Sequence, residues 1–457
     1  MRTPTRIDLT TGSVHRHLIR MALPMIFGLT ASMSFSFVDL YFIGTLGDDS
    51  LAAMGFVARV IMIIFSATIG LSAGISSVLA RAAGSNNQEE VKKIATNTFI
   101  LTLLLSVFFT VSGLLTIDPL FILMGADEDI LPLIREYMTI WYFSPLFMML
   151  PMTGGAVMRA LGDTKYQGKI MIFAAIGNAI LDPLLIFGHF GFPELGIAGA
   201  AWASLIIQFI TFVTIFYALY CRYHVICFKK ETVGDFFNSV KKIMHVGIPA
   251  TGTNMIIPIV SAIIISIIAD YGNEAVAATN VATTIEFLAL VPFFALSAVI
   301  GPFIGQNLGA GNYERIDECI KKSTMFCLAW GALLAFLLMF FAVPIATMFS
   351  TDQDIVKITA LYLCYVPASY GLYGLVMSVN AIFNSIGQPF PGVVISTMRV
   401  FVLQLPLVFI ASMHYDLDIV FMLISLSNMI AGIIGYIWIM KTTAALKPFP
   451  TDAALTD

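Results

Sequence analysis

A succession of long apolar runs constrains this sequence more than any other feature. A transmembrane helix needs about 20 predominantly apolar residues. Of the 457 residues only 11% are charged, against roughly a quarter in soluble globular proteins, so lipid must be the main solvent of the folded chain. We predict an all-α membrane protein with twelve transmembrane helices, at approximately 18–44, 51–80, 94–117, 131–157, 168–190, 196–220, 243–269, 276–305, 320–348, 358–384, 391–413 and 417–440.

The placement of Lys and Arg predicts the orientation of these spans. Cytoplasmic loops of membrane proteins carry an excess of basic residues. Basic residues gather before the first run and in the even-numbered connections, among them Arg16, Arg20, Arg81, Lys92, Lys93, Arg159, Lys165, Lys241, Lys242 and Arg315. Acidic residues dominate the odd-numbered connections, among them Asp127, Asp129, Asp270, Glu274, Asp352 and Asp416. We therefore expect a multi-pass protein of the bacterial inner (plasma) membrane with both termini in the cytoplasm, and no cleavable signal peptide.

The sequence also repeats itself at an offset of 225 residues. The matching pairs include glycines and prolines at loop positions, where chance is a poor explanation: Pro24 with Pro249, Gly84 with Gly309, Asn87 with Asn312, Tyr137 with Tyr362, and Gly162 with Gly387. After four spans the register slips, because Pro183 best matches Pro406. An even number of spans per copy keeps both copies in one orientation, as in parallel transporter repeats.

The repeat predicts the domain organisation. We expect an N-terminal six-helix lobe at 1–221, a cytoplasmic linker at 222–242, a C-terminal six-helix lobe at 243–441 and a cytoplasmic tail at 442–457. Two such pseudo-symmetric lobes would enclose a cavity and expose it to either side of the membrane by rocking. The alternative, a duplicated scaffold without a cavity, is disfavoured because charged residues lie inside the spans.

Several functional classes find no support in the sequence. The cysteines form no CxxC pair, and there is no HExxH motif, P-loop or dinucleotide-binding glycine fingerprint. No basic tail or patch suggests nucleic acid. We expect a protein that is not an enzyme, needs no cofactor, works as a monomer, and has the lipid bilayer and small amphipathic molecules as partners.

Two acids deep within the first half are the main candidates for chemistry. Asp39 lies past the middle of the first span and shares a helix face with Ser36, three residues earlier. Asp182 lies past the middle of the fifth span, on the face that carries Asn178 four residues before it. Pro183 follows and removes a backbone donor next to the carboxylate. Acids inside a membrane are costly and usually mark function.

Such a pair can hold a proton at neutral pH or bind sodium with the nearby amide and hydroxyl oxygens. Either event neutralises the site and can bias a two-state bundle. In the alternative, both acids are hydrogen-bonded anchors of helix packing. The repeat favours an ion site, because Asp39 aligns with Ile264, and Asp182 aligns with Leu407, or with Leu405 after the slip. The second half therefore kept the frame and lacks the carboxylates. Pro24, early in the first span, is a plausible kink site.

Other candidates are less specific. Glu286 in the eighth span either faces the central cavity or is a packed, satisfied acid. Met33 and Met54 would suit an adaptable apolar cavity but are equally typical of gap-filling residues. Arg59 and Arg399 lie near predicted span ends and are expected to reach the interface.

The whole chain resembles the multidrug and toxic compound extrusion family, and within it the DinF-type branch. The resemblance rests on Pro24 and Asp39, on Tyr137 and on Asn178 with Asp182–Pro183. It also rests on the loop motifs LARAAGSNNQEE, IGQNLGAGNYER, MRALGDTKY and FNSIGQPFP. It implies efflux of amphipathic, often cationic, compounds in exchange for protons or sodium. It also implies a cation site at Asp39, Asn178 and Asp182 with Tyr137 close by, and a bend of the first span at Pro24.

Departures from related branches guide the choice of ion. Another branch carries acids on spans seven and ten for sodium, whereas this chain has only Asp270 at the end of span seven. A threonine ligand often found on span six is replaced here by Ala200, Ala203 and Ser204. We therefore expect proton coupling, with sodium coupling as the alternative. A lipid-linked flippase is a further alternative, disfavoured because it would need intramembrane Arg or Lys for pyrophosphate.

Overall fold

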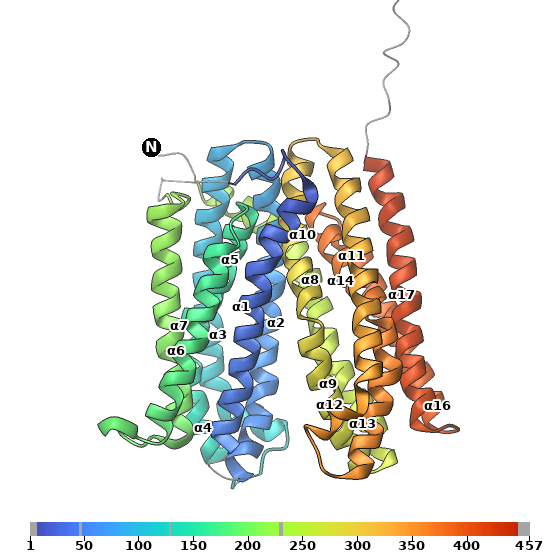
Figure 1. Cartoon of the computed structure of the whole chain (residues 1–457). Coiled ribbons are helices and arrows are strands. Elements are labelled where there is room, and N and C mark those ends of the chain that lie inside the picture. Colours follow the sequence, from blue (N-terminus) through green and yellow to red (C-terminus); the bar gives the residue numbers. More distant parts are fainter. Residues whose placement is uncertain (1–6, 45–47, 128, 228–231, 447–457) are drawn as a thin grey trace, which may run out of the picture. The chain divides into compact units, whose positions relative to one another are not determined.

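The computed structural model describes residues 7–44, 48–127, 129–227 and 232–446, and every regular element within these ranges is a helix. In the first half of the chain these are α1 (Val14–Gly44), α2 (Asp48–Gly84), α3 (Gln88–Leu123), α4 (Leu131–Trp141), α5 (Ser144–Ala160), α6 (Lys165–Ile186), η1 (His189–Gly191), α7 (Gly196–Tyr217) and η2 (Ala218–Arg222). Figure 1 shows that the long helices within each half run roughly side by side in one direction.

The second half begins with α8 (Val233–Ile268) and η3 (Ala269–Tyr271). It continues with α9 (Asn273–Ala289), α10 (Val291–Gly309), α11 (Tyr313–Phe340), α12 (Ala342–Thr347), α13 (Gln353–Tyr365), η4 (Val366–Ser369), α14 (Tyr370–Ser385), α15 (Pro389–Thr397), η5 (Met398–Gln404), α16 (Leu405–Ser412) and α17 (Leu417–Leu446).

The number of spans agrees with the prediction of an all-α protein with twelve transmembrane helices. Among the described residues, 11 helices are long and apolar enough to cross a membrane. A twelfth span is formed if α4 and α5, which are bent by 52° at their junction, are taken together. The predicted span 276–305 is broken at Leu290, so that only α10 passes this test by itself.

Helix ends follow the repeat. Asn87 precedes α3, and its side chain accepts a hydrogen bond from the amide of Glu90; its partner in the repeat, Asn312, precedes α11. Gly162 follows α5 with φ +88°, and Gly387 follows α14 with φ +80°. Glycine adopts this left-handed conformation without the steric cost that a Cβ imposes. Local chemistry thus ends equivalent helices in the same way in both halves.

The helices form two compact units. Unit 1 comprises Arg20–Met255 together with the N-terminal residues up to Asp8. Two groups of buried apolar residues stabilise it: one is centred on α2, α3 and α5, and the other joins α2 to α4 and α7. The first half of α8 belongs to unit 1 because its backbone lies against α2. A Cβ added to Gly74 would lie 2.3 Å from the carbonyl oxygen of Ile243.

The predicted linker 222–242 therefore contains the first ten residues of α8. Its helical part is fixed to α3 within unit 1: Lys93 Nζ lies 2.7 Å from Asp235 Oδ1, and Asn97 Nδ2 donates to Ser239 Oγ over 3.0 Å. The predicted C-terminal tail at 442–457 is helical as far as Leu446, and the rest lies outside the described residues.

Among the described residues, unit 2 comprises 256–446 and the segment Leu9–Ile19. Arg315 holds this N-terminal segment with its guanidinium, which donates to the carbonyl oxygens of Gly12 (2.6 Å) and Leu9 (3.0 Å). The amide of Leu9 donates to Gln306 Oε1 over 3.2 Å. Sequence patterns gave no sign of this attachment, because its partners lie about 300 positions apart in the chain.

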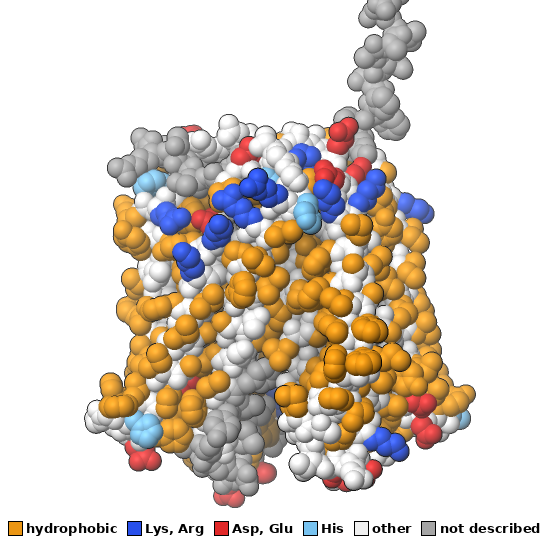
Figure 2. All heavy atoms as spheres, viewed as in Figure 1, with side chains coloured by type: hydrophobic (Ala, Val, Ile, Leu, Met, Phe, Trp, Pro, Cys, Tyr) orange, Lys and Arg blue, Asp and Glu red, His pale blue; other side chains and the backbone are white. Residues whose placement is uncertain are grey.

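The surfaces of the helices are apolar along their middle parts. Figure 2 shows hydrophobic side chains there and charged side chains toward the helix ends. Exposed members include Phe108, Leu115, Phe173, Phe336 and Ile433. Exposed apolar surface of this extent marks a membrane-embedded protein.

Candidate functional site

Four residues of unit 1 make up what we call the acid cluster: Asp39 on α1, Tyr137 on α4, and Asn178 and Asp182 on α6. Asp182 is fully buried and Tyr137 is 3% exposed. The charges of Asp39 and Asp182 act on each other, and both act on Tyr137. The structure thus brings together three groups that are up to 143 positions apart in the sequence.

Four buried side-chain oxygens of the acid cluster have no hydrogen-bond partner among the described residues. Among the described residues, none forms a hydrogen bond with Oδ1 of Asp39, with Oδ1 of Asn178 or with either carboxyl oxygen of Asp182, although all four atoms are buried. A buried carboxylate without a partner is costly. These oxygens can be satisfied by a bound proton on each acid, or by a cation that the three side chains hold together.

Close backbone packing positions α1 against α6. A Cβ added to Gly168 would lie 2.5 Å from the carbonyl oxygen of Pro24, and one added to Gly28 would lie 3.2 Å from Met171. Small residues at such crossings let transmembrane helices approach closely. Pro24 therefore lies where α1 touches the helix that carries Asp182.

The remaining unit 1 candidates are spread over different surroundings. Met54 is buried among the apolar residues of α2, α4 and α7, Met33 is half-buried on α1, and Ser204 is half-buried on α7. The side chain of Ser36 lies outside the described residues.

Unit 2 contains a second polar group, which we call the arginine cluster: Glu286, Tyr362, Ser369, Tyr373, Arg399 and Asn428. Glu286 on α9 accepts a hydrogen bond from the hydroxyl of Tyr362 on α13. Arg399 in η5 donates through Nη1 to Asn428 Oδ1 over 2.9 Å, and Asn428 Nδ2 donates to Ser369 Oγ over 3.1 Å. The guanidinium lies over the ring of Tyr373, 4.6 Å from its centroid.

The expectation for Arg399 was wrong. It was placed near a span end, but it is the eleventh residue of the span Pro389–Ser412 and only 9% of its surface is exposed. Helix contacts with α17 bury it, and such contacts cannot be read from the local sequence. The flippase alternative was disfavoured because the spans lacked Arg and Lys, and the buried position of Arg399 weakens that objection. For Glu286, the structure shows a hydrogen-bonded acid.

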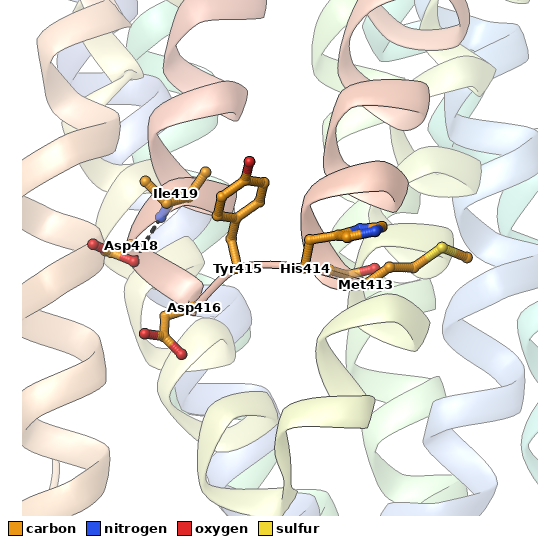
Figure 3. Close-up of a pocket in the computed structure, with 7 residues that line it drawn as sticks. Met413, His414, Tyr415, Asp416, Asp418 and Ile419 are labelled. Carbon is orange, nitrogen blue, oxygen red and sulfur yellow. Dashed lines mark hydrogen bonds between the residues drawn. The ribbon is translucent and has the colours of Figure 1, made fainter.

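The described part of the chain also has a surface hollow at the loop between α16 and α17 (Figure 3). It is lined by Ser412, Met413, His414, Tyr415, Asp416, Asp418 and Ile419. The side chain of Asp418 is occupied at the start of α17, where it accepts from the amide of Ile419 over 2.9 Å. None of the predicted site residues lines this hollow.

The geometry can now be compared with known proteins. The profile of the MatE family matches this chain twice, at residues 24–184 and 249–410. The chain belongs to the MatE family. The two matches begin 225 residues apart (249 − 24). MatE proteins are membrane transporters, and this chain is therefore a multi-pass membrane protein of a transporter family.

Individual MatE relatives cover nearly the whole chain. A Shewanella oneidensis protein described as an FAD transporter is 34% identical over 98% of this chain and 99% of its own length. A probable multidrug resistance protein of Bacillus subtilis, YoeA, is 27% identical over 89% of each chain. The structure of the Vibrio cholerae MATE transporter VcmN in its bent form has a TM-score of 0.90 and 28% identity, over 96% of this chain and 99% of that one.

Proposed function

We propose that this chain is a secondary active efflux antiporter of the inner membrane, which expels amphipathic small molecules in exchange for protons by alternating access. The observation that carries the proposal is the set of buried, unpartnered oxygens on Asp39, Asn178 and Asp182. Because no described residue forms a hydrogen bond with these oxygens, the protonation state of the acids should change the energy of the surrounding helices. A site of this kind couples proton binding to a change between two arrangements.

Protons are favoured over sodium by the surroundings of the acids. Sodium requires several oxygen ligands, and the position on α7 where a further hydroxyl would be expected is occupied by Ala200 and Ala203, with Ser204 next to them. A proton needs only one carboxyl oxygen and leaves the remaining oxygens as acceptors. Sodium coupling is the alternative, and the experiment below distinguishes it from proton coupling.

The proposal is tested in everted membrane vesicles that contain the full chain. A pH-sensitive dye reports proton release from respiring vesicles when a cationic substrate such as ethidium is added, with and without sodium. Asp39→Asn and Asp182→Asn are each expected to abolish this signal. Asp118→Asn is the matched control, because Asp118 is an exposed acid of α3 that pairs with Arg135. Normal exchange in both cluster variants would refute the site, and exchange that requires sodium would replace the proton by sodium.

A second candidate substrate class is an anionic, nucleotide-like compound. Two observations favour it: the Shewanella oneidensis relative is described as an FAD transporter, and Arg399 is buried inside a span of unit 2. Accumulation of FAD by the same vesicles, against riboflavin as the uncharged comparison, distinguishes this class from cationic drugs.

A further inference from the structure

The starting observation is a buried arginine that forms no ion pair with any described residue. Arg399 is 9% exposed, and among the described residues no carboxylate lies within ion-pair distance of it. A buried charge that forms no ion pair is costly to the fold. Arg399 nevertheless occupies the eleventh position of the 24-residue span Pro389–Ser412.

The neighbours of the guanidinium hold it in place and leave donors free. Asn428 accepts from Nη1, and Ser369 fixes the orientation of that amide by accepting from its Nδ2. Tyr373 covers one face of the guanidinium. Nε is buried and has no partner among the described residues. These contacts fix the orientation of the Arg399 guanidinium. Its Nε–H remains without a hydrogen-bond acceptor among the described residues.

Glu286, a described acid whose charge acts on Arg399, has another partner. The charges of Glu286 and Arg399 act on each other, but the Glu286 carboxyl is engaged by the hydroxyl of Tyr362. The ring of Tyr362 is in turn fixed against Phe421, with ring centroids 5.0 Å apart. The Glu286 carboxyl is therefore bonded to Tyr362 and forms no ion pair with Arg399.

The backbone at Arg399 is also irregular. Met398–Gln404 form a π-helical segment between α15 and α16. Such segments are rare, and they occur often at functional sites because they re-aim side chains out of the regular α-helical pattern. The equivalent region of unit 1, on α6, is a regular helix. Unit 1 has a π-helical segment elsewhere, at Ala218–Arg222, so the irregular turn at this position is specific to the copy that carries the arginine.

We propose that the arginine cluster binds the phosphate group of an amphipathic aromatic substrate. An arginine guanidinium offers parallel N–H donors that match phosphate oxygens, and the free Nε is one of them. Tyr373, which is half-buried, places an aromatic ring next to the guanidinium. The proposal deepens the proposed transport function and rests on it, since it names the substrate class that unit 2 recognises.

The test measures equilibrium binding to the purified full chain in detergent, so that it does not depend on ion coupling. The probes are FAD, which carries a pyrophosphate, and riboflavin, which has the same ring system and no phosphate. Flavin fluorescence anisotropy gives the dissociation constants. For the intact protein we expect FAD to bind more tightly than riboflavin.

Three variants separate recognition from a structural role. Arg399→Gln should weaken FAD binding by about 10- to 100-fold and leave riboflavin binding unchanged. Asn428→Asp is nearly isosteric and places a carboxylate where Nη1 already bonds, so it should occupy the guanidinium and weaken FAD binding similarly. If Arg399 had only a structural role, Asn428→Asp would keep or raise the stability of the fold and would not weaken FAD binding. Glu286→Gln keeps an acceptor for Tyr362 and removes the opposing charge, so FAD should bind several-fold more tightly.

The matched control is Arg59→Gln, because Arg59 on α2 also lies over an aromatic ring, that of Phe56, but is exposed. Equal loss of FAD binding in this control would overturn the proposal, as would unchanged FAD binding in folded Asn428→Asp. Competition by phosphatidylglycerol micelles distinguishes a lipid phosphate from a soluble one: displacement of FAD only in proteins that retain Arg399 shows that a lipid headgroup shares the site. Ethidium-driven proton release measures the proposed antiport separately, so failure of one does not imply failure of the other.

Discussion

The two halves of this chain have one frame and two different polar interiors. Tyr137 and Tyr362 are related by the 225-residue offset, and each lies on the shorter helix before a break, α4 before α5 and α13 before η4. In unit 1 the tyrosine lies near two acids that have unpartnered oxygens. In unit 2 its counterpart donates to an acid that shares its surroundings with an arginine.

This difference suggests that the two halves have different functions. The acid cluster has no base and few donors, so its energy depends on whether protons are present. The arginine cluster carries one acid and one base, and the acid is held by a hydroxyl. Duplication of a scaffold supplies two similar helix bundles, and substitution of a few intramembrane residues can then give each bundle a separate task.

The largest expected effect tests this asymmetry directly. Asp182→Asn should reduce ethidium-driven proton release to the level of vesicles without the protein, whereas Glu286→Gln should leave release above that level, because we propose that only the acid cluster exchanges protons. Dye-based proton release in everted vesicles measures both. Loss of release in the Glu286 variant would show that both halves carry coupling acids.

The repeat-related tyrosines should differ in their effect on stability. Tyr362→Phe removes the hydroxyl that satisfies Glu286 and should lower the free energy of unfolding by about 1–2 kcal/mol. Tyr137→Phe should change it by less than about 0.5 kcal/mol, because the Tyr137 hydroxyl forms no hydrogen bond with any residue that the structure describes. Unfolding of the purified chain in mixed micelles gives both values. Equal losses would mean that the hydroxyls have equivalent roles.

Close helix crossings provide a comparison of packing. A Cβ on Gly331 of α11 would lie 2.3 Å from Gly371 on α14, so Gly331→Ala should destabilise unit 2 by about 1–3 kcal/mol. Gly252→Ala is the control, since nothing lies within 4 Å of the added atom.

In unit 1, Gly168→Ala adds a Cβ against Pro24 and should also slow transport, if α1 moves there. A transport rate that falls no more than in Gly331→Ala would argue against a hinge at Pro24.

The smallest expected effect concerns the ion pair that fixes α8 to α3. Asp235→Asn removes the contact with Lys93, whose side chain is 29% exposed, while that of Asp235 is 40% exposed. Solvent screens such pairs, so the loss of stability should be the smallest of those compared and should shrink further in high salt. Thermal unfolding at two salt concentrations measures it. A larger loss would show that the start of α8 is more important to unit 1 than its exposure suggests.

The sequence by itself determined the spans, the duplicated frame and the acids of the first half. These signals are local or periodic: apolar runs of membrane length, glycines that end equivalent helices at 162 and 387, and rare intramembrane carboxylates at 39 and 182. The assignment of these acids as the coupling site, and the DinF-type branch, remain predictions.

Only the tertiary structure decided how residues on different helices combine. It moved Arg399 from a predicted interface to a buried position with Asn428, paired Glu286 with Tyr362 and attached Leu9–Ile19 to Arg315. These contacts join positions 29 to 306 residues apart. Helical periodicity fixes which face of a helix a residue occupies, but which neighbour meets that face depends on the packing of all the helices in the unit.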